Sequence, residues 1–195
     1  MTENDSARDR LLAAAVRRFG AAGALGVTLD DIRKEAGVSV GAVYHHFPDK
    51  ASLHAAAWLD VLDRYRAGFL ETLRRRSGAE EGVRGVVAYH LKWVAEHRDA
   101  AALLFSNRPI HGVGADELRA RNAAFYGEAS AWWLTHVRYD VLRELEVELV
   151  HALWLGPSEA FCRGWLAGRY KRVPPSVTRV LADAAWHSLR APTAE

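Results

Sequence analysis

Residues 28–50 read TLDDIRKEAGVSVGAVYHHFPDK, and this stretch predicts two short helices joined by a tight turn. Thr28 suits the N-cap of the first helix, because its hydroxyl can accept a hydrogen bond from a free N–H group at the helix start. Gly37 can leave that helix with φ > 0. Ser39 is the expected N-cap of the second helix, which Pro48 prevents from continuing unchanged. We therefore expect a helix-turn-helix unit.

The second helix is predicted to bury one face and to expose the other. At about 100° of rotation per residue, Val43 and Phe47 share the buried face, and Val40 lies at its margin. Gly41 and His45 point the opposite way. Small residues at the outer N-terminal end would let the backbone enter the major groove of DNA, so we expect this face to bind DNA.

The candidate DNA-contact residues come from the two caps, the outer face and the start of the next helix. His45 is expected to meet base edges, whereas Tyr44 and Lys50 are expected to meet phosphates. The complete predicted set is Thr28, Ser39, Gly41, Ala42, Tyr44, His45 and Lys50.

Charge adds little to this expectation. The formal net charge is +2, and the first fifty residues carry seven basic and seven acidic side chains, which cancel. DNA contact must therefore depend on where individual cations lie, with Arg17 or Arg18 as further candidates. A non-specific architectural DNA binder would need a more basic surface.

The pattern resembles the DNA-binding signature of the TetR family of ligand-responsive transcriptional regulators. The positions that carry the resemblance are Thr28, Ile32, Ala36-Gly37-Val38-Ser39, Gly41, Tyr44, Phe47 and Lys50. The resemblance covers roughly residues 8–55. It departs from the family at Arg33, where a small Ala is usual. The sequence leaves open whether Arg33 changes the packing at this position or adds a phosphate contact. The resemblance implies a palindromic operator in double-stranded DNA, and a repressor released by an unknown small apolar or amphipathic effector. Activation or co-repression stays open.

The rest of the chain predicts an all-α fold. Apolar residues at helical spacing predict a helix over 7–19 that backs the unit, and a long helix from Lys50 to about residue 74. Further helices are expected over 80–98, 99–107, 115–138, 141–154, after Pro157, and from residue 177. We assign residues 1–50 to the DNA-binding domain and residues 51–195 to a helical ligand-binding and dimerisation domain, with the long helix shared as a lever.

Two further sites follow from the resemblance. The helices behind the DNA-binding domain would enclose a pocket for the effector, lined by Trp58, Trp93, Phe105, Phe125 and Trp132. The last two helices would form a homodimer, with Ala160, Gly164 and Gly168 at i, i+4 and i+8 as a smooth strip, joined by Val177, Val180 and Ala184.

Other functional classes find little support. The sequence offers no phosphate-binding loop, no paired cysteines and no Ser, His, Asp signature, so no catalytic residue and no cofactor is expected. His90 and His97 are about 10.5 Å apart along a helix, too far for one metal ion. Cys162 is at most a weak reactive thiol, and a redox role for it stays open. The alternative is a helical ligand-binding protein or enzyme without DNA function.

The expected location is the cytoplasm. A single cysteine cannot form an internal disulfide, and the polar N-terminus lacks the apolar run of a signal peptide. No stretch is apolar enough for a membrane span.

Overall fold

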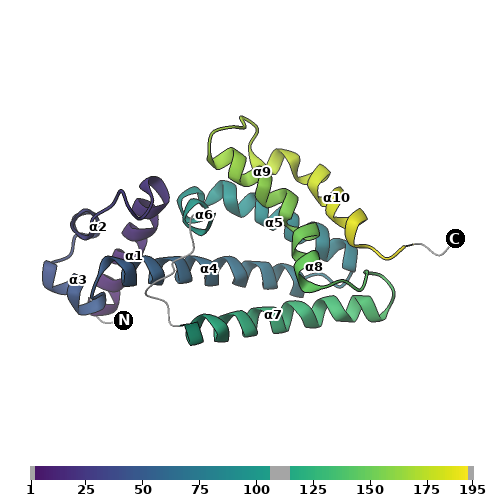
Figure 1. The fold of residues 1–195 in the computed structure, drawn as a ribbon, viewed down its shortest axis with the longest axis horizontal. Coiled ribbons are helices and arrows are strands. Elements are labelled where there is room, and N and C mark those ends of the chain that lie inside the picture. Colours follow the sequence, from purple (N-terminus) through teal and green to yellow (C-terminus); the bar gives the residue numbers. More distant parts are fainter. Residues whose placement is uncertain (1–2, 106–114, 193–195) are drawn as a thin grey trace. The chain divides into compact units, whose positions relative to one another are not determined.

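The computed structural model describes residues 3–105 and 115–192, and every regular element among these residues is helical (Figure 1). The chain is therefore all-α, as predicted. The elements are α1 (Glu3–Ala22), α2 (Leu29–Ala36), α3 (Val40–His46), α4 (Lys50–Arg74), α5 (Ala79–Glu96), α6 (Arg98–Phe105), α7 (Ala115–Arg138), α8 (Val147–Trp154), α9 (Gly156–Leu166), the 3-10 helix η1 (Pro174–Val177) and α10 (Thr178–Leu189).

Packing divides the chain into two compact units. The first unit contains Met1–Arg64 and His97–Arg119, and the second contains Tyr65–Glu96 and Ala120–Glu195. Helix α4 therefore contributes residues to both units. The boundary at residue 50, which followed from the sequence, stays a prediction.

In the first unit, α1 is the element on which the others pack. It contacts α2, α3 and α6, and its apolar stripe supplies Leu11 and Phe19 to a core that also buries Ile32 and Leu53. Gly20 lies so close to α6 that an added Cβ atom would overlap the backbone carbonyl of Asp99. The glycine is therefore required by space at this crossing.

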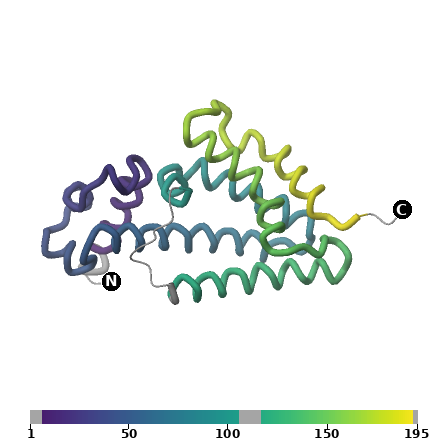
Figure 2. Tube along the Cα trace, in the orientation of Figure 1, coloured from purple at the N-terminus to yellow at the C-terminus, as the bar shows by residue number. Residues whose placement is uncertain are grey.

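In the second unit, α5 is the central helix (Figure 2). It packs against α9, η1 and α10, and its valines at positions 83, 86, 87 and 94 are completely buried. The indole N–H of Trp154 donates a hydrogen bond of 3.0 Å to the carbonyl of Val83, which ties α8 to α5. Arg84 pairs with Asp183, which ties α5 to α10.

The helix expected over 141–154 begins six residues late. Leu142 instead forms an isolated antiparallel bridge with Arg190, and the Ala191 N–H donates to the carbonyl of Val141 at 2.9 Å. This pairing with the end of the chain satisfies backbone groups that a helix would otherwise have bonded locally. Helix α6 is described only to Phe105, and residues 106–107, its predicted end, lie outside the described residues.

The predicted strip of small residues on α9 is also wrong. Helix α9 ends at Leu166, and Gly168 lies beyond it with φ 73°. The ring of Tyr170 stacks on Phe161 with centroids 5.3 Å apart and covers Gly164, where an added Cβ would overlap it. The chain itself therefore uses the space at Gly164, and only Ala160 of the three is exposed on the helix.

Substitution of Gly20 by Ala tests the close approach of α1 and α6. The added methyl group meets backbone, which cannot rotate away, so we expect the free energy of unfolding to fall by about 1–3 kcal/mol. Urea denaturation of the purified protein measures it.

Gly127→Ala on α7 is the matched control, because nothing lies within 4 Å of the added Cβ atom there. The better helix propensity of alanine should raise the stability by up to about 1 kcal/mol. Equal changes in the free energy of unfolding for the two substitutions would argue against the close contact between α1 and α6 at Gly20.

Candidate nucleic-acid interface

Helix α2 begins in a reciprocal capping box. The Thr28 hydroxyl accepts a hydrogen bond of 3.1 Å from the Asp31 N–H, and the Asp31 carboxylate accepts one of 3.0 Å from the Thr28 N–H. The Thr28 hydroxyl also donates a hydrogen bond of 2.6 Å to the Asp31 carboxylate. This bond and the one from the Thr28 N–H favour the ionised carboxylate, so the pKa of Asp31 lies below its usual value. The predicted cap at Thr28 is confirmed, and the start of α2 is fixed by two residues three positions apart.

The turn after α2 needs a residue in the left-handed region. Gly37 has φ 64° and ψ 39°, and an added Cβ would meet nothing within 4 Å, so conformation and not space requires the glycine. The Arg33 side chain donates to the Val38 carbonyl at 3.2 Å and to the Asp30 carboxylate at 2.8 Å. Arg33, whose role the sequence left open, therefore holds the turn between the two helices.

Helix α3 is anchored at few points. The Ser39 hydroxyl accepts a hydrogen bond of 3.2 Å from the Ala42 N–H, which confirms the predicted cap. Val43 and Phe47 are buried, and the Arg8 guanidinium lies 5.8 Å from the centroid of the Phe47 ring. The cap thus fixes the start of α3, and the two buried side chains attach the helix to the unit and fix which of its faces is presented outward.

The outward face of α3 carries the residues that the sequence assigned to it. Gly41, Tyr44 and His45 are exposed, with Tyr44 at 59% of its accessible surface, and Ala42 is partly buried beside the Ser39 cap. Val40, expected at the margin of the buried face, is 56% exposed. It stands on the first turn of a seven-residue helix. This apolar side chain is therefore part of the surface.

Arg17 and Arg18, considered as phosphate contacts, both pair with Glu35 on α2. The Arg17 Nε atom lies 2.7 Å from one carboxylate oxygen, and Arg18 binds the other. The hydrogen bond from Arg17 holds the pKa of Glu35 below its ordinary value. The two arginines therefore tie α1 to α2, and both remain about half exposed.

Lys50 is tied to the loop that precedes α2. Its ammonium group donates to the carbonyl of Ala24 at 2.9 Å and to that of Val27 at 3.0 Å. Two of its three N–H bonds are thus used inside the unit. A phosphate contact through the third stays a prediction, and Lys50 has in addition a structural role that sequence reasoning missed.

The five residues predicted to line an effector pocket are divided between the two units. Trp58, which is buried, and Phe105, which is partly exposed, belong to the first unit. In the second, Trp93 packs edge-on against Tyr65, with ring centroids 5.0 Å apart. Contact of any of them with a ligand stays a prediction.

The other two residues of that set pack into a cluster of aromatic rings in the second unit. Phe125 meets Phe69 edge-on at 5.3 Å between centroids. Trp132 stacks on Trp154 at 5.8 Å and covers Gly82, where a Cβ atom would overlap the indole. These rings fill space against one another, which is the usual role of large aromatic side chains at helical spacing.

A polar group lies inside the second unit. His90 is 2% exposed, and its Nδ1 atom lies 2.9 Å from the Tyr65 hydroxyl oxygen. Burial lowers the pKa of His90 to about 4 and raises that of the Cys162 thiol to about 12. Near neutral pH the histidine is therefore uncharged and the thiol protonated, which makes Cys162 a poor nucleophile.

Residues 3–105 and 115–192 contain no cluster of three or more His, Cys, Asp or Glu side chains placed to hold a metal ion. None of the helices in this part of the chain has the length and apolar content that a bilayer span needs.

The helix-turn-helix segment matches a known family. Residues 11–57 fit the family described as "Bacterial regulatory proteins, tetR family". The chain is 36% identical over 80 residues to the HTH-type transcriptional regulator BetI of Agrobacterium fabrum, a match that covers 41% of this chain and 39% of that protein. The chain spans less than half the length of each of the curated relatives that it matches.

Solved structures extend the likeness to nearly the whole fold. A TetR family transcription regulator from Marinobacter aquaeolei VT8 has a TM-score of 0.82 and 19% identity, over 96% of this chain and 97% of that one. The regulator FadR from Bacillus subtilis, solved in complex with stearoyl-CoA, has a TM-score of 0.75 and 16% identity, over 92% and 98%. At these low sequence identities, the structural similarity shows the fold alone.

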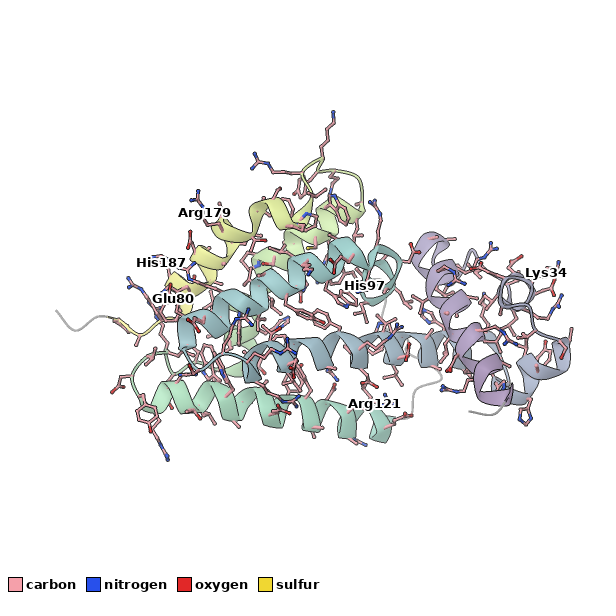
Figure 3. All side chains as sticks on the ribbon, turned by 180° about the vertical axis from the view of Figure 1, so that it is seen from behind. Lys34, Glu80, His97, Arg121, Arg179 and His187 are labelled. Atoms are coloured by element: carbon pink, nitrogen blue, oxygen red, sulfur yellow. The ribbon has the colours of Figure 1, made fainter. Side chains whose placement is uncertain are left out.

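Removal of the Lys50 amine should loosen the first unit. Lys50→Met retains the aliphatic length but leaves the Ala24 and Val27 carbonyls without this donor, so we expect a loss of about 1–3 kcal/mol in the free energy of unfolding. The control is Lys34→Met, because Lys34 projects from α2 and is 66% exposed (Figure 3). Urea denaturation should show a change below about 0.5 kcal/mol for the control. Equal changes would argue against the structural role of Lys50.

Protonation of His90 should destabilise the protein in acid. The folded pKa of about 4 lies below the ordinary 6.5, so the unfolded chain binds the proton more tightly. The free energy of unfolding should fall as the pH drops from about 6.5 to about 4, by at most about 1.4 kcal/mol per pH unit from this group. His90→Asn removes the contribution. A stability difference between wild type and variant that is constant over this range would contradict the prediction.

Proposed function

We propose that this chain is a regulator of the TetR type, which binds operator DNA and represses transcription until a small ligand releases it. The observation that carries the proposal is the outward face of α3. It combines Gly41, Tyr44 and His45 on a helix whose opposite side is fixed by Val43 and Phe47.

In the proposed complex, α3 lies in the major groove of double-stranded DNA. Gly41 lacks a side chain, so the backbone can approach the base pairs, and His45 beside it can hydrogen-bond to base edges. Tyr44 and the N–H groups at the starts of α2 and α3 contact phosphates. Because Arg17 and Arg18 already pair with Glu35, the salt dependence of binding per subunit should be modest.

The proposed functional unit is a homodimer formed through the C-terminal helices. Val180 on α10 is 65% exposed, and Val147 and Leu149 on α8 are exposed too, so apolar surface is available on these elements. A two-fold dimer presents two copies of α3 to successive half-sites, and this favours a palindromic operator.

The proposed effector is apolar or amphipathic. The second unit is rich in aromatic rings, and it holds the polar pair His90 and Tyr65, so both ends of an amphipathic molecule have complementary side chains. The FadR structure with stearoyl-CoA supports a fatty-acyl compound as the first class to test. Because α4 has residues in both units, a ligand that prefers one tilt of this helix would change DNA affinity by its differential binding.

A cytoplasmic location is proposed, because the chromosome lies there and the single Cys162 stays reduced in that compartment. The alternative function, a helical ligand carrier or enzyme that does not act on DNA, predicts ligand binding without any DNA complex. The same binding assay separates the two functions.

The decisive measurement is binding of the purified protein to DNA flanking its own coding sequence, compared with random duplex at moderate salt. We expect a clear preference for one flanking fragment. His45→Ala should lose about 1–3 kcal/mol of binding free energy and relax the preference at one base position. Addition of a long-chain acyl-CoA in the same assay tests the ligand class.

His97→Ala is the control, because His97 is an exposed histidine between α5 and α6, remote in sequence from α3 and outside the C-terminal helices. It should bind the preferred fragment as wild type does. Equal affinity of wild type for all fragments, or no effect of His45→Ala, would argue against the proposed function.

A further inference from the structure

Val40 is an exposed apolar side chain on a surface whose other members are polar or small. It occupies the first position of α3, directly after the Ser39 cap, and 56% of its surface is accessible. A valine exposed to this extent loses the free energy that burial would contribute. The surface formed by Val40, Gly41 and Tyr44 therefore has an apolar part that internal packing does not explain.

The helical geometry sets where Val40 would lie in a DNA complex. Val40 and Tyr44 are four residues apart and lie one above the other on one edge of the outward face. A Cβ atom added at Gly41 would meet only the Ser39 hydroxyl oxygen, at 4.0 Å. The first turn of α3 is thus open on this side, and it is the N-terminal part of a recognition helix that meets base edges.

We propose that Val40 contacts the 5-methyl group of a thymine and thereby specifies an A·T pair at one position of each half-site. This inference rests on the proposed DNA binding. The methyl group of thymine is the one apolar feature among the base edges of the major groove, and valine has no group that could hydrogen-bond to the others. Cytosine lacks the methyl group, so the contact discriminates against it.

A different role for Val40 would be to support the Tyr44 ring, since the two side chains are neighbours on α3. A supporting residue acts through Tyr44, which is assigned to a phosphate, so its loss would weaken all duplexes alike. A base contact instead predicts a loss confined to one thymine. The two roles can therefore be distinguished by whether binding weakens on all duplexes or at one thymine alone.

The test uses the full chain and a duplex selected by wild type from a random pool. Each thymine of that duplex is replaced in turn by deoxyuridine, which removes only the 5-methyl group. We expect one thymine per half-site whose replacement weakens binding by about fourfold, the effect of burying one methyl group. For Val40→Ala and Val40→Ser, the thymine and uracil duplexes should bind equally well.

Leu25→Ala is the matched control, because Leu25 is a 99% exposed apolar residue in the loop before α2. It should retain the full uracil penalty. The inference would be overturned if both Val40 variants still bound the uracil duplex more weakly than the thymine duplex. It would also be overturned if each variant lowered the affinity for the two duplexes by the same factor. Selection of a duplex without any methyl-sensitive thymine overturns the inference alone. Failure to select any duplex overturns the proposed function as well.

Discussion

The helix-turn-helix unit depends on the left-handed turn at Gly37. A helix as short as α3 is unstable by itself, since isolated helices shorter than about 12–15 residues are marginal in water. Its position must come from the turn and from Val43 and Phe47. Because the Arg33 side chain bonds to the carbonyl of Val38, the turn is held from α2 as well as by its own backbone. The outward face of α3 is therefore preorganised, and little ordering is left for binding.

The cations near this unit serve mainly to assemble it. Arg17 and Arg18 share Glu35, Lys50 bonds to two carbonyls of the loop before α2, and Arg10 bonds to the carbonyl of Ala36 at the end of α2. Each of these contacts joins segments distant in sequence. As a result, the surface that remains for recognition is nearly neutral. In the proposed DNA complex, shape, a few hydrogen bonds and apolar contact would therefore supply the specificity.

The second unit combines an apolar helical core with a partly buried polar pair. The valines of α5 and the ring of Trp154 are buried, and His90 and Tyr65 add two polar groups to the same unit. Burial of this pair costs desolvation free energy, and the same desolvation lowers the pKa of His90.

The sequence by itself determined the all-α class, the two caps, the turn glycine and the outward residues of α3, because each depends on neighbours within about one helical turn. The tertiary structure decided what depends on distant partners. Lys50 finds carbonyls 23 and 26 residues earlier, and Leu142 pairs with Arg190 in place of a helical turn. The exposure of Val40 also depends on the tertiary structure. The helical angle gives the direction of its side chain, but the packing of other elements decides whether that side chain is covered.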